Sequence, residues 1–130
     1  MADVDYGQAE IAAFNAAAEA GTIEFDPAAV TEAVGLYDRM IAGLYQIRDR
    51  MRDAVFQTGF GGFESGLELQ RGFCNKAADG INAINQLIEG AMRLQEAYLR
   101  AGNLISEADQ RNADTLRFVA EAAEPGSPKA

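Results

Sequence analysis

The side chains that most often carry out enzymatic chemistry are scarce in this sequence. The 130-residue chain contains no histidine and one cysteine, Cys74. Without histidine, neither a Ser–His nor a Cys–His nucleophile can be assembled, and the commonest metal ligand is missing. Cys74 lies on an apolar row beside Phe73 and Ala77 with no neighbour placed to activate its thiol, which predicts a small buried hydrophobe. The sequence therefore predicts no catalytic residue.

Carboxylates are abundant and give the chain a formal net charge of -9 at pH 7. A two-metal helical bundle needs Glu-x-x-His pairs that face inward, but here the acids lie mostly off the apolar faces, so we expect no metal site and no cofactor. The charge also opposes binding to nucleic acid or to an anionic membrane, because both attract clustered Lys and Arg. The nearest basic cluster, Arg48, Arg50 and Arg52, is interrupted by Asp49 and Asp53. No apolar stretch approaches the ~20 residues that span a bilayer, so we expect no membrane insertion.

A glycine-rich segment near the middle of the chain contains the motif Phe60-Gly61-Gly62-Phe63. It is only superficially similar to a phosphate-binding loop, because no Lys-Ser/Thr follows and helical patterns flank it on both sides. We predict a turn instead. Gly59 is expected at the left-handed position that ends the preceding helix. Ser65 and Glu68 form a capping box that predicts the start of the next helix.

Apolar residues at helical spacing predict the elements on either side of this turn. The first long helix is expected to begin at Pro27, with Asp26 as its N-cap, and to end near Gln57. The second is predicted from Gly66 to about Ala120. In this second helix Gly80 falls within an apolar row, which indicates close approach of the two helices, and Gly102-Asn103 marks a kink or a frayed point.

The predicted fold class is all-α. An antiparallel hairpin of two long helices forms one domain over residues 25–121. Residues 1–24 are expected to add a short helix that ends at Gly21, and residues 122–130 a disordered tail.

Both long helices carry apolar faces that are wider than a two-helix seam requires. Exposing such faces would cost about 25 cal/mol per Å², and large exposed apolar patches usually mark interfaces. We therefore expect a partner to complete a four-helix bundle. The residues predicted to bury the seam and the partner interface are Val34, Ile41, Leu44, Met51, Ile81, Ile84, Leu87, Ile88, Leu94 and Tyr98.

This arrangement resembles the WXG, or ESAT-like, proteins of type VII secretion. Phe60-Gly61-Gly62 stands where that family has Trp-x-Gly, and Phe25–Val30 is similar to the start of many secretion-associated relatives. The resemblance extends over about residues 25–120.

The export signal of that family, Tyr-x-x-x-Asp/Glu after the second helix, is not matched. Gly102 follows Tyr98 at that spacing, and Tyr45 with Asp49 fits the letters but lies in the first long helix. The chain would therefore be the partner that lacks the signal, or a targeting adaptor.

The resemblance implies a non-enzymatic protein that pairs with another small helical-hairpin protein or with the helical N-terminal domain of a secreted effector. It implies a cytoplasmic protein before export, and secretion without a cleaved signal peptide. The acidic segment Met1–Gly7, which has no apolar core, agrees with that expectation. The residues alone leave two alternatives open: a homo-oligomeric structural or regulatory protein unrelated to secretion, and an enzyme or ligand carrier with a pocket between helices.

Overall fold

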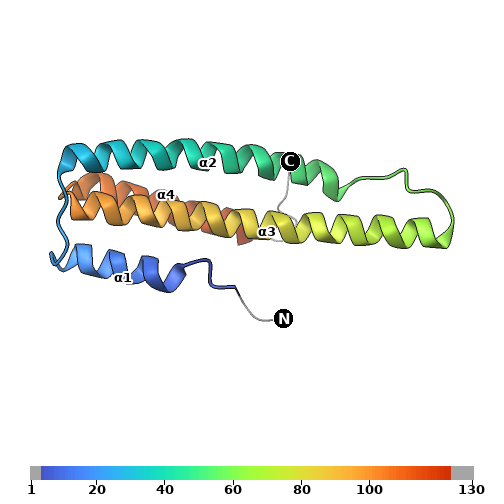
Figure 1. Cartoon of the computed structure of the whole chain (residues 1–130), viewed down its shortest axis with the longest axis horizontal. Coiled ribbons are helices and arrows are strands. Elements are labelled where there is room, and N and C mark those ends of the chain that lie inside the picture. The colour runs from blue at the N-terminus through green and yellow to red at the C-terminus, as the bar shows by residue number, and fades with distance from the viewer. Residues whose placement is uncertain (1–3, 124–130) are drawn as a thin grey trace.

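The computed structural model describes residues 4–123, and all regular secondary structure in that range is helical. Its helices are α1 (Gln8–Glu19), α2 (Pro27–Val55), α3 (Glu64–Ala101) and α4 (Ile105–Ala123). α3 is the central helix, and each of the other three packs against it (Figure 1). The all-α prediction is confirmed. The predicted tail, 122–130, lies outside the described residues except for its first two positions, which belong to α4.

Two of the predicted helix boundaries are confirmed in atomic detail. Pro27 opens α2, and the Asp26 carboxylate accepts a hydrogen bond from the Ala29 N–H at 3.2 Å. At the end of α1, Gly21 adopts the left-handed conformation with φ 79°. The N–H of Thr22 then donates to the Ala17 carbonyl, which closes the Schellman motif that stops a helix.

The prediction of one continuous helix from Gly66 to about Ala120 is wrong. α3 ends at Ala101, and α4 folds back along it. The cause is a second Schellman motif, in which Asn103 is left-handed with φ 61° and the Leu104 N–H donates to the Leu99 carbonyl at 2.8 Å. Gly102 permits this turn to pack against α2, because a Cβ there would lie 2.9 Å from a Val30 methyl group.

The turn between α2 and α3 also differs from the prediction at both ends. α2 ends at Val55, so Gly59, although left-handed with φ 96°, lies beyond the helix end. α3 begins at Glu64 with Phe63 as its N-cap and no side-chain cap, so the predicted capping box does not form. The predicted close approach at Gly80 is confirmed, because a Cβ there would lie 2.9 Å from the Met51 sulfur.

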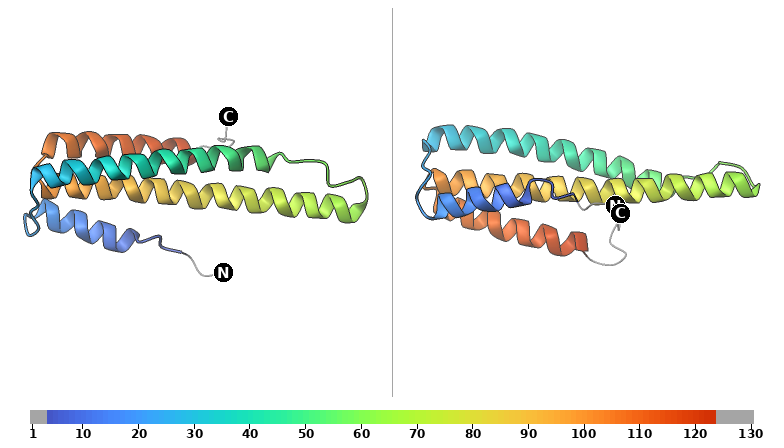
Figure 2. Two further views of the ribbon diagram at one scale, coloured as in Figure 1. Left: turned by 45° about the horizontal axis from the view of Figure 1, so that its top comes forward. Right: turned by 60° about the horizontal axis from the view of Figure 1, so that its bottom comes forward.

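The molecule consists of a packed body and a two-helix arm. Within residues 4–123, no residue between Ile41 and Ile81 is buried, and we call this stretch, 42–80, the arm. The rest of the described chain is the body, and its core has two clusters. These are Ile41, Ile84, Ile88, Ala91 and Met92, and then Val30, Leu99 and Ala108. Figures 1 and 2 show the arm projecting beyond the ends of α1 and α4.

Candidate interaction surface

The side chains of residues 4–123 do not assemble a metal centre. No group of three or more Cys, Asp or Glu side chains in this range is placed to hold a metal ion. None of the four helices is long and apolar enough to cross a bilayer.

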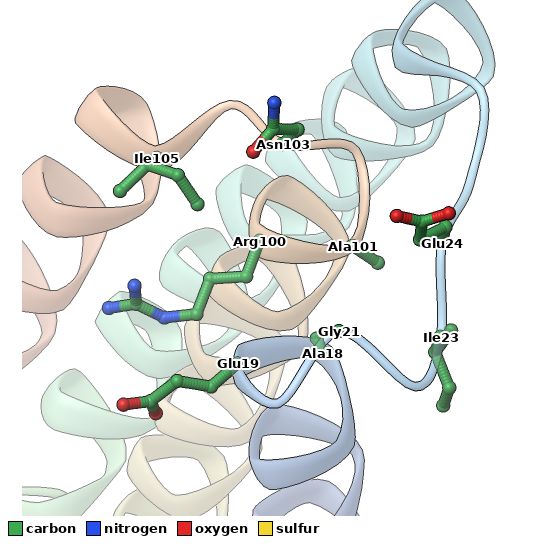
Figure 3. Close-up of a pocket in the computed structure, with 9 residues that line it drawn as sticks. All are labelled: Ala18, Glu19, Gly21, Ile23, Glu24, Arg100, Ala101, Asn103 and Ile105. Carbon is green, nitrogen blue, oxygen red and sulfur yellow. The ribbon is translucent and has the colours of Figure 1, made fainter.

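A pocket of about 300 Å³ lies between the end of α1 and the turn that joins α3 to α4 (Figure 3). Its lining includes Glu19, Glu24 and Arg100. Arg100 is 14% exposed and forms ion pairs with Glu96 at 2.9 Å and with Asp109 at 3.2 Å. Burial alone would lower the pKa of Arg100, but these two carboxylates outweigh it and raise the pKa. The pocket therefore presents a cation that is already neutralised and two acids, which gives no basis for assigning a ligand.

Large apolar side chains are exposed along one side of both long helices. On α2 they are Leu36, Met40 and Ile47, which are 54%, 46% and 42% exposed. On α3 they are Leu69, Phe73 and Leu87, which are 63%, 44% and 42% exposed, while Leu67, 46% exposed, points to the other side of α3. Spacings of four, seven and fourteen residues place the members of each set on one side of their helix. We call these six residues the open face.

α4 lies on the opposite side of the α2–α3 hairpin. Its side chains contact Asp38, Tyr45 and Arg48 of α2. Tyr45 is separated from Met40 and from Ile47 by about half a helical turn. Figure 1 shows α4 behind α2 and α3, while Figure 2 shows α1 along the edge of α3. α4 therefore covers one face of the hairpin, and the six open-face side chains stay exposed on the other.

Phe118 is the main side chain by which α4 packs against α2, through the Tyr45 ring and the Arg48 guanidinium. The Arg48 guanidinium lies 4.5 Å from the Tyr45 ring centroid and 5.8 Å from that of Phe118, and it donates to the Asn85 side chain. Burial lowers the pKa of Arg48, and the neighbouring charge of Arg52 lowers it further. In the sequence, Arg48 stands at heptad spacing in the otherwise apolar row Val34, Ile41, Arg48 and Val55. This interruption was the available signal that a different helix covers that side.

A buried polar residue of α3, Gln95, links α3 to α2 and, through Asp38, to α4. Gln95 is fully buried, and its amide donates to the Val34 carbonyl at 3.0 Å and to the Asp38 carboxylate at 2.7 Å. Asp38 also lies 3.7 Å from Arg111 of α4. Sequence reasoning did not identify Gln95, because a glutamine between apolar positions carries no distinctive pattern.

Most of the predicted interface residues are used within the chain. Ile41, Ile81, Ile84 and Ile88 are buried. The half-buried members are Val34, Leu44, Met51, Leu94 and Tyr98. Leu87 is exposed and belongs to the open face. The other five residues of the open face were not among those predicted.

Tyr98 owes its position to an aromatic cluster at the α1 end of the body. Its ring lies 5.1 Å from Phe14, 5.7 Å from Phe25 and 5.9 Å from Tyr37. Burial raises the pKa of Tyr37, and the neighbouring Tyr98 raises it further. α1 and the segment before α2 therefore cover Tyr98, which was predicted to bury the seam or the partner interface.

The turn motif lies at the far end of the arm. The rings of Phe60 and Phe73 lie 5.6 Å apart, so the turn folds back onto α3. Gly61 is left-handed with φ 99°, and Gly62 is exposed. Phe63 is 85% exposed. The tip therefore presents an apolar side chain to any partner that reaches it.

No protein-family model, no curated protein and no solved structure matches this chain. The resemblance to WXG proteins stays a prediction that rests on the turn and on the segment before α2.

Proposed function

We propose that this protein is a non-enzymatic interaction protein that binds the helices of a partner on its open face. The observation that carries the proposal is the alignment of six exposed apolar side chains along one side of α2 and α3, opposite α4. Covering them would remove apolar area from water at a gain of about 25 cal/mol per Å². A helical partner fits best, because ridges at helical spacing pack into the grooves of another helix.

The resemblance to WXG proteins supports a more specific setting. We propose that the chain acts in type VII secretion, as a co-secreted substrate or as a targeting adaptor. The partner would be another small helical-hairpin protein or the helical N-terminal domain of a larger effector. Phe60-Gly61-Gly62 at the tip of the arm is the feature that supports this setting.

The solution mass of the purified chain, alone and with the product of the adjacent gene, tests the proposal. We expect a complex in one of these two samples, measured by light scattering. Met40→Asp, Leu69→Asp and Leu87→Asp each place a charge on the open face, and at least one of them should abolish the complex. The matched control is Leu116→Asp, because Leu116 is 55% exposed on α4, away from the open face. A monomer in both samples, or a complex that tolerates all three open-face variants, would contradict the proposal.

A further inference from the structure

The charges of the chain are divided unevenly between arm and body. The arm contains five basic and five acidic residues. The whole net charge of -9 therefore lies outside it. Two copies of such a molecule repel each other through their bodies, whereas their arms can meet without that penalty. An arrangement that overlaps the arms and keeps the bodies apart is the one that the charges favour.

The part of α3 within the arm carries a row that suits such an overlap. Glu68, Gly72 and Lys76 follow one another at intervals of four residues, and the open-face residues Leu69 and Phe73 lie beside them. All five are exposed. Among the ion pairs within residues 4–123, none involves Glu68 or Lys76. The row therefore presents an acid and a base that the chain itself leaves without an opposite charge.

The packing of its own chain does not explain a glycine at position 72, as is also true of Gly35 and Gly43 in α2. Glycine in a helix interior is less favourable than alanine. A Cβ on Gly80 would lie 2.9 Å from Met51, and one on Gly102 would lie 2.9 Å from Val30, so those two glycines are explained by close packing. A Cβ on Gly72 would meet nothing within 4 Å. Close approach of a second helix is what a glycine at this place would permit.

We infer that a second copy of this chain is the partner of the arm, with the two α3 helices antiparallel and crossing at Gly72 on a two-fold axis. In that arrangement the residue four positions before the crossing faces the residue four positions after it. Glu68 of each copy then meets Lys76 of the second copy, and the pair occurs twice, as an isologous interface requires. Leu69 and Phe73 of both copies become covered, and the acidic bodies lie at opposite ends. The inference rests on the proposed function, because it names the partner of the arm part of the open face, Leu69 and Phe73.

Charge reversal tests the crossing directly. Glu68→Lys and Lys76→Glu each create two like-charge contacts per dimer, and each should raise the dimer Kd at least about tenfold. The double variant should restore the wild-type Kd. An equimolar mixture of the two single variants should also form a dimer, because each then supplies the charge that the other lacks. Sedimentation or light scattering over the micromolar range measures all four, with circular dichroism to confirm that each variant is helical.

Leu69→Asp tests the apolar part of the same contact and should give a monomer, whereas Leu116→Asp on α4 should leave the dimer intact. A wild-type chain that stays monomeric overturns the inference, and so does a dimer that is indifferent to both charge reversals or is not restored in the mixture. The proposed function fails separately. The chain alone could be monomeric and still bind the adjacent gene product through Met40 and Leu87. The inference of a second copy would then be wrong, and the proposed binding on the open face would be supported. The adjacent gene product would then be the occupant of the open face.

Discussion

The two halves of α3 belong to one helix but have different surroundings. From Ile81 to Ala101, eleven residues are buried. From Glu64 to Gly80, none is buried, although Leu67, Leu69 and Phe73 lie there. Six of the 17 residues from Glu64 to Gly80 are apolar, against 12 of the 21 from Ile81 to Ala101. The difference in burial therefore comes both from this composition and from the neighbouring helices. An amphipathic pattern predicts which side of a helix is buried. It does not predict whether a helix of the same chain or a partner buries it.

Helix length explains where the cover ends. At 1.5 Å per residue, the 38 residues of α3 extend for about 57 Å. The 19 residues of α4 and the 12 of α1 extend for about 28 Å and about 18 Å. Both pack from the Ala101 end of α3, so neither can reach its first half. α2 alone accompanies α3 along the arm.

The largest expected effect that separates the two halves is on the free energy of unfolding. Ile88 is fully buried among the body clusters, so Ile88→Ala should lower it by about 2–5 kcal/mol. Phe73 is 44% exposed, so Phe73→Ala should lower it by about 1 kcal/mol or less. Urea titration followed by circular dichroism measures both. Equal losses would show that the arm is packed as tightly as the body, and the comparison between the two halves would fail.

The next largest expected effect on the free energy of unfolding is at Gly102, in the turn between α3 and α4. Gly102→Ala brings a methyl group against the branched Val30 side chain, and we expect a loss of about 1–3 kcal/mol in unfolding free energy. Gly80→Ala is the matched variant in the arm. It meets the flexible end of Met51, which can move aside, so its loss should be clearly smaller. If Gly80→Ala costs as much as Gly102→Ala, the two long helices are held in the arm as rigidly as in the body.

The start of α2 and the end of α1 could be predicted because their signals are local. Asp26, Pro27 and Gly21 each act through contacts within a few residues. The end of α3 was only partly predictable. Gly102-Asn103 indicated a kink, but the reversal depends on the Schellman hydrogen bonds and on space next to Val30, which is distant in sequence.

The candidate surface was less predictable than the fold, because it also depends on contacts between residues that are distant in sequence. Ile41 and Ile88 carry the same apolar signal as Leu87, yet the first two are buried in one cluster between α2, α3 and α4 and the third is exposed. The sequence predicted that surplus apolar surface exists, and the position of α4 decides which part of it remains. Arg48 within an apolar row was the sequence feature that marked the covered side.

The smallest expected effect is a gain in stability at Gly72. In a chain made monomeric by Leu69→Asp, Gly72→Ala should raise the unfolding free energy by about 0.5–1 kcal/mol, because alanine is the better helix former and its methyl group meets nothing within 4 Å. In the otherwise wild-type chain the same change should weaken the dimer, because the methyl group enters the proposed crossing. Opposite signs in the two backgrounds would assign Gly72 to an intermolecular contact. A loss of stability in the monomeric background would mean that the fold of the arm itself requires the glycine, and the charge reversals would then be the sole support for the crossing.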